Sequence, residues 1–149
     1  MGIACVRASL VEKAGGAPAA NAVLQLKLPD ESLWYGLANP RGEVVVMFPY
    51  PTFEVAPGDA DDPIPLPLTE QSWSLEVSVL YNPDALVYAP RSSRPDLSSP
   101  FLQPSGTLWE DPGAPAGVPV ATTTLRFDEE LVMRTGTLPE LWVEAGEMP

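Results

Sequence analysis

The sequence contains no histidine, and this limits the chemistry that its side chains can perform. Ser-His-Asp and Cys-His nucleophilic sites, imidazole metal ligands and the most common general base are all excluded. No GxxxxGKS/T or GxGxxG loop occurs either, so the sequence offers no cradle for phosphate. We therefore expect a protein that is not an enzyme, with no catalytic residue, no cofactor and no metal.

Carboxylates are the remaining groups that could act as acid and base. Asp59, Asp61 and Asp62 form one cluster, and residues 128–130 form another. A glycosidase needs two carboxylates about 5 to 10 Å apart on opposite walls of a cleft, whereas these neighbours lie in loop-like sequence. Oxygens of 58–62 could wrap a calcium ion, but the twelfth-position glutamate of a helix-loop-helix site is missing. We interpret both clusters as solvated charge, with hydrolysis and calcium binding as weaker alternatives.

The net charge also argues against two classes of partner, nucleic acids and membranes. The chain has 20 acidic and 8 basic residues, a formal net charge of -12. Such a charge repels phosphate backbones and anionic headgroups, and no apolar run reaches membrane-spanning length, so we expect no nucleic acid and no membrane insertion. The excess acid favours solubility or steering toward a basic protein partner.

The N-terminal region indicates where the protein works. Cys5 is the single cysteine, so no intramolecular disulfide can form. The first twenty residues lack the basic start and unbroken apolar stretch of a secretory signal. We expect a cytoplasmic location, including a particle assembled in the cytoplasm.

Composition and periodicity predict the elements that must position any site. With 19 prolines and 11 glycines, the 149 residues are typical of a loop-rich, all-β fold, and the length fits one domain over 1–149. Alternating apolar residues from Trp73 to Tyr81 predict a central strand, and residues 129–134 could form a helical turn. The stretches 86–88 and 107–109 could be short strands or anchors. The predicted strands cover 3–12, 22–28, 33–37, 43–48, 73–81, 120–127 and 138–143.

Seven strands joined by turns favour a transthyretin/immunoglobulin-like β-sandwich. Two proline-rich loops, 49–67 and 82–119, are too long for ordinary connections, and loops of this kind usually carry function. Trp109 would favour partner contact if it is exposed in the second loop. The aromatic candidates for partner contact are Phe48, Tyr50, Phe53, Tyr88, Phe101 and Trp109.

The stretch from Gly15 to Val23 (GGAPAANAV), followed by residues 35–49 (YGLANPRGEVVVMFP), resembles the carboxypeptidase regulatory-like modules. These are transthyretin-like, seven-stranded β-sandwiches, and the resemblance covers roughly residues 3 to 55 of this chain. It implies a scaffolding or adhesion piece without catalysis. The chain departs from the family in its proline-rich 49–67 stretch and in 82–119, which has no counterpart in the minimal module.

The residues FPYP at 48–51 are similar to those of small proteins that accompany contractile phage-tail-like injection systems. We therefore expect a structural or interaction protein, a β-sandwich whose proline-rich loops dock onto the protein subunits of a larger assembly. A carbohydrate- or peptide-binding module, with Trp109 as its platform, is the alternative.

Overall fold

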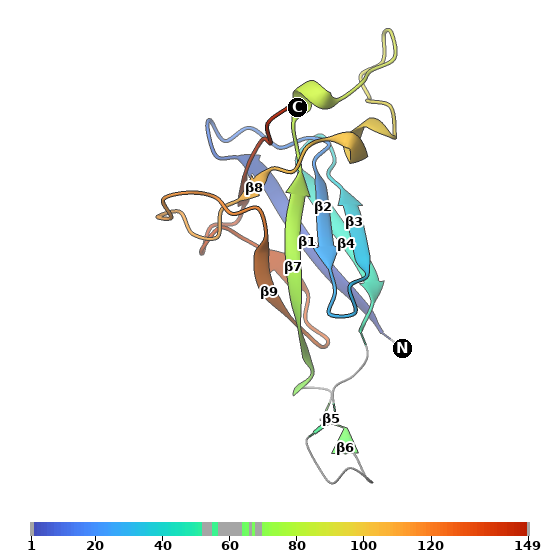
Figure 1. The fold of residues 1–149 in the computed structure, drawn as a ribbon, viewed down its shortest axis with the longest axis vertical. Coiled ribbons are helices and arrows are strands. Elements are labelled where there is room, and N and C mark those ends of the chain that lie inside the picture. The colour runs from blue at the N-terminus through green and yellow to red at the C-terminus, as the bar shows by residue number, and fades with distance from the viewer. Residues whose placement is uncertain (1, 52–54, 57–63, 66, 68–69, 149) are drawn as a thin grey trace.

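The computed structural model describes residues 2–51, 55–56, 64–65, 67 and 70–148, and it shows an all-β protein with two packed sheets (Figure 1). The sheet strands are β1 (Ile3–Glu12), β2 (Val23–Lys27), β3 (Leu33–Leu37), β4 (Glu43–Pro49), β7 (Ser72–Leu80), β8 (Thr107–Leu108), β9 (Ala121–Arg126), β10 (Leu131–Met133) and β11 (Leu141–Glu144). Outside the sheets, β5 (Val55–Ala56) pairs with β6 (Ile64–Pro65), and the 3-10 turns η2 (Pro83–Ala85) and η3 (Ser99–Leu102) follow β7.

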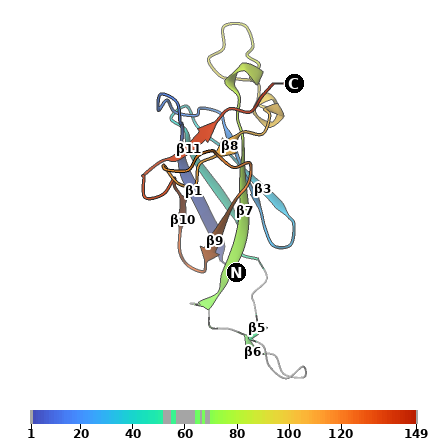
Figure 2. The ribbon, with the colours of Figure 1, turned by 60° about the vertical axis from the view of Figure 1, so that its left-hand side comes forward.

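The long strand β1 organises the five-stranded sheet. Its residues 3–9 pair with β4 in antiparallel register along one edge. Along the other edge, β10 pairs in parallel with residues 6–8 and β11 pairs in parallel with residues 10–12. β8 then pairs with β11 in antiparallel register. Figure 2 shows β10, β1, β11 and β8 together.

The four-stranded sheet is antiparallel throughout, in the order β3-β2-β7-β9. The predicted alternation in β7 is confirmed, because Trp73, Leu75, Val77, Val79 and Tyr81 are all buried. The strand lies between β2 and β9, as its apolar face indicated. Alternate residues of β1, β2 and β4 join the same hydrophobic core between the two sheets.

The turn that leads into β4 depends on Asn39 and Gly42. The Asn39 Oδ1 atom accepts hydrogen bonds from the backbone N–H groups of Arg41 and Glu43, at 2.9 and 3.0 Å. Gly42 has φ +78°, and a Cβ there would lie 2.2 Å from the Leu10 carbonyl oxygen. Glycine is required at this position because any side chain would collide with β1.

The prediction of an all-β, two-sheet sandwich is confirmed, but two details of it were wrong. In the described residues the sheets hold five and four strands, not seven in total. β8 falls in the stretch 107–109, which was expected to be a short strand or an anchor, whereas β10 was not predicted because its three residues are too few to show a period-two pattern. The predicted helical turn at 129–134 contains β10, since pairing with β1 decides its conformation and Leu131 packs against the core.

Candidate interaction surface

The loop between β7 and β8 is anchored by two buried polar side chains, Asn82 and Gln103. The Gln103 Oε1 atom accepts a hydrogen bond from the Asn82 N–H at 3.0 Å. Its Nε2 donates to the carbonyl oxygens of Asn21 (2.8 Å) and Pro100 (2.9 Å). Asn82 Nδ2 donates to the Gly146 carbonyl oxygen at 2.8 Å, near the C-terminus. Both ends of the loop are therefore tied to the sandwich.

The outer part of the loop also carries its own hydrogen bonds. The Asp96 N–H donates to the Val87 carbonyl oxygen at 2.7 Å, and Tyr88 and Pro95 form an isolated antiparallel bridge. The Ser99 hydroxyl donates to the Asp96 carbonyl oxygen at 2.9 Å. The loop projects beyond the sheets at the end opposite β5 and β6 (Figures 1 and 2). It is a defined protrusion and not a featureless linker.

The loop and the edge strand β3 together enclose an apolar hollow of about 560 Å³, which we call the loop groove. Its apolar lining comprises Ala20, Leu37, Ala38, Pro40, Tyr88, Pro95, Leu97 and Pro100. Arg94 is the one charged residue of this lining, although the chain is strongly acidic. Arg94 forms no ion pair with any carboxylate in the described part of the chain.

Large apolar side chains in the lining of the loop groove, or close to its lining residues in sequence, are open to solvent. Leu97 is 81% exposed and Leu102 is 76% exposed. The exposed rings of Tyr35, on β3, and Phe101, in η3, meet edge to face with centroids 6.1 Å apart. An exposed apolar patch supported by ordered backbone is typical of a protein contact surface.

Two of the six aromatic candidates are exposed: Tyr88 lines the loop groove, and Phe101 directly follows the lining residue Pro100. Tyr50 is half-buried and packs on Phe127 and Trp73, with ring centroids 4.9 and 5.3 Å apart, so most of its ring belongs to the sandwich. Phe53 lies outside the described residues. Partner contact by Tyr88, Phe101 and Tyr50 stays a prediction.

Phe48 and Trp109 are corrected to interior residues. Phe48 is 1% exposed because the alternation of β4 points it into the core, where the centres of the Phe48 and Trp34 rings are 6.1 Å apart. Trp109 is 6% exposed, and its indole Nε1 donates to the Glu144 carboxylate at 2.8 Å. The Lys13 ammonium also lies 4.3 Å from the centre of the Trp109 ring. Neither ring offers a free face to a partner or a sugar.

A hollow of about 340 Å³ beside Lys13 is lined by three carboxylates, those of Glu12, Asp84 and Glu144. Glu12 accepts a 2.5 Å hydrogen bond from the Tyr81 hydroxyl, and Glu144 accepts one from Trp109. Burial, and then this bond to Glu12, raise the pKa of the Tyr81 phenol. Two of the three carboxylates thus fasten aromatic side chains of the sandwich in place.

Of the two predicted acidic clusters, only the one at 128–130 lies in the described part of the chain. Glu130 forms an ion pair with Arg7 at 2.5 Å on the surface, and Asp59, Asp61 and Asp62 lie outside the described residues. Where the structure is described, no group of three or more Cys, Asp or Glu side chains could hold a metal ion. The predicted loop 49–67 lies mostly outside that part of the chain.

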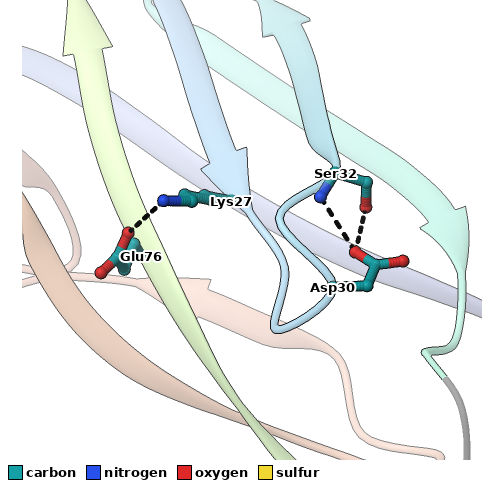
Figure 3. A network of polar contacts seen from close by, with 4 residues as sticks. All are labelled: Lys27, Asp30, Ser32 and Glu76. Atoms are coloured by element: carbon teal, nitrogen blue, oxygen red, sulfur yellow. Dashed lines mark hydrogen bonds and ion pairs between the residues drawn. The ribbon is translucent and has the colours of Figure 1, made fainter.

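A small polar network lies at the turn between β2 and β3 (Figure 3). The backbone N–H and the hydroxyl of Ser32 donate to one Asp30 carboxylate oxygen, at 3.0 and 2.6 Å. These bonds lower the pKa of Asp30. On the neighbouring strands, the Lys27 ammonium lies 3.8 Å from the Glu76 carboxylate. The Asp30–Ser32 bonds hold the turn and the Lys27–Glu76 pair joins β2 to β7; all are exposed, so we assign them a structural role.

Sequence reasoning missed Asn82 and Gln103, which anchor the loop, and Leu97, which lines the loop groove beside the predicted aromatic Tyr88. Asn82 had a readable signal, because an asparagine before proline at the end of a strand often caps a turn, and its Oδ1 accepts the Asp84 N–H at 2.9 Å. Gln103 and Leu97 carry no local signal, since their roles depend on chain segments that are distant in sequence.

Within the described residues, no helix is both long and apolar enough to cross a bilayer. Comparisons of the chain with protein-family models, with curated proteins and with solved structures find no match.

Proposed function

We propose that this protein is a non-catalytic structural or interaction protein that docks through its proline-rich loops onto subunits of a larger assembly. A contractile, phage-tail-like injection particle assembled in the cytoplasm is the kind of assembly we favour. The observation that carries the proposal is the loop groove, where a hydrogen-bonded loop presents Leu97 and other apolar side chains to solvent. An exposed apolar patch of this kind does not stabilise an isolated monomer, but its burial against another subunit would stabilise the complex.

The anchoring of the loop supports this function energetically. Binding by a mobile loop loses conformational entropy, whereas a loop already fixed by Asn82, Gln103 and its prolines loses less. Arg94 adds a cation to an apolar lining, which is a combination enriched at protein interfaces. A protein segment with apolar side chains and an acidic flank fits this lining.

We propose further that the sandwich is of the transthyretin-like kind found in carboxypeptidase regulatory-like modules. The two packed sheets and the Asn39–Gly42 turn into β4 support this assignment. The additional strands β8 and β10 would then be elaborations that tie the loop after β7 and the C-terminal part of the chain to β1 and β11.

An isolated peptide is the second ligand class that the loop groove fits, because its lining is apolar with one cation. Carbohydrate binding has less support, since Trp109, the expected platform, is buried and hydrogen-bonded.

The proposal is tested by following the chain in a native lysate. We expect wild-type chain to travel with a large particle on size exclusion, and Leu97→Asp to be released from it. Thr124→Asp adds the same charge at an exposed position of β9 and should remain with the particle. A wild-type chain that elutes free, or a Leu97→Asp chain that stays with the particle, would contradict the proposal.

A further inference from the structure

The outward face of β1 and β4 is apolar where a solvated sheet face is usually polar. Ile3, Val45 and Met47 are 56%, 52% and 62% exposed. The strand register places Cys5 opposite Met47, next to Ile3 along β1, and Val132 of β10 lies beside Arg7. We call this surface, made by Ile3, Cys5, Val45, Met47 and Val132, the β1–β4 face. It is separate from the loop groove, with which it shares no residue.

The charged side chains that line the hollow on the β1–β4 face cancel once the ion-pair partner of Arg7 is included, whereas the whole chain is strongly acidic. Arg7 is paired with Glu130 at 2.5 Å. Glu43, at the start of β4, and Arg134, directly after β10, both line a hollow of about 270 Å³ on this face, which Arg7 and Val132 also line. These four residues give two positive and two negative charges, whereas the whole chain has a net charge of -12.

We propose that the β1–β4 face is a self-association surface, which binds the same face of a second copy about a two-fold axis. Such an interface must be complementary to itself, so a surface with excess acid would repel its own copy. The β1–β4 face meets this requirement, because it is apolar with balanced charges. The two-fold arrangement also allows Glu43 of each copy to approach Arg134 of the other, and it brings two Cys5 thiols to one interface.

The experiment measures the molar mass of the purified chain by sedimentation equilibrium over a wide concentration range. We expect the mass to rise from the 16.0 kDa monomer toward the dimer. Added salt should strengthen the dimer, because it screens the repulsion between two acidic bodies more than it weakens the few ion pairs across the interface, and it does not weaken apolar contacts.

Met47→Glu introduces a charge at the most exposed apolar side chain of the face, and it should raise the dimer dissociation constant at least tenfold. Thr124→Glu is the matched control, with the same new charge on the other sheet, and should dimerise as the wild type does. A short bismaleimide should crosslink wild-type chains through Cys5 and should fail with Met47→Glu. Circular dichroism checks that both variants are folded.

A wild-type chain that stays monomeric at every concentration would overturn the proposal, and a different protein would then be the candidate that covers this face. Equal weakening by Met47→Glu and Thr124→Glu would also overturn it, because the effect would then follow net charge alone. Neither result bears on the loop groove, whose test uses Leu97→Asp, so the two proposals fail independently.

Discussion

Replacing Gln103 by alanine should loosen the base of the loop between β7 and β8. The side chain is 4% exposed and makes three hydrogen bonds, to the Asn82 N–H and to the carbonyl oxygens of Asn21 and Pro100. At about 1 kcal/mol for each bond, the loss is roughly 3 kcal/mol. Ser99→Ala is a matched control within the same loop, because it removes one side-chain bond and should cost about 1 kcal/mol.

Two assays together show in which part of the structure Gln103→Ala loses stability. Urea denaturation followed by tryptophan fluorescence gives the global free energy of unfolding, and amide hydrogen exchange reports opening at Asn82 and along the loop. We expect Gln103→Ala to lose protection at Asn82, with the strands of the core still protected below the global transition. The reasoning would be refuted if Gln103→Ala and Ser99→Ala had the same stability and the same protection at Asn82.

Three further predictions concern titration and backbone geometry. Because burial raises the pKa of the Tyr81 phenol above its ordinary value of 10.0, the unfolded chain releases this proton before the folded chain does. The free energy of unfolding should therefore fall as the pH rises above 10.0, and it should fall less in Tyr81→Phe, as denaturation at several alkaline pH values would show. Ser32→Ala removes a bond that lowers the pKa of Asp30, so an NMR titration of this carboxyl should have a higher midpoint in the variant; an unchanged midpoint would contradict the assigned cause. Gly42→Ala should destabilise the chain far more than Gly15→Ala, since both have positive φ but only the first Cβ meets backbone; equal losses in thermal unfolding would argue against the close approach to β1.

The strands were predictable where an apolar period of two is long and uninterrupted. β7 and β2 bury the faces that their alternation indicated, because each lies in the interior of its sheet and local pattern agrees with tertiary packing. β10 was not predicted because three residues are too few to show an alternating pattern. Its conformation depends on pairing with β1, which lies more than a hundred residues away in sequence.

The proposed contact surface was harder to predict than the fold. Aromatic residues were chosen by type, but exposure is decided by which face of a strand they occupy, and Phe48 falls on the inward face of β4. Trp109 lies within the predicted loop 82–119, in the stretch 107–109 that could be a short strand or an anchor; β8 forms there and pairs with β11, and the Trp109 ring is buried and donates to Glu144. The loop groove depends on Gln103 reaching Asn21, a contact that no local pattern records.

The most direct test of contact through the loop groove is photo-crosslinking in the native host. A photoreactive phenylalanine analogue would replace Leu97 in one chain and Thr124 in another, since both positions are exposed. We predict that the probe at 97 captures one protein subunit in high yield and that the probe at 124 captures none. Equal, diffuse crosslinking from both positions would contradict the claim that this protein functions by docking through its loop.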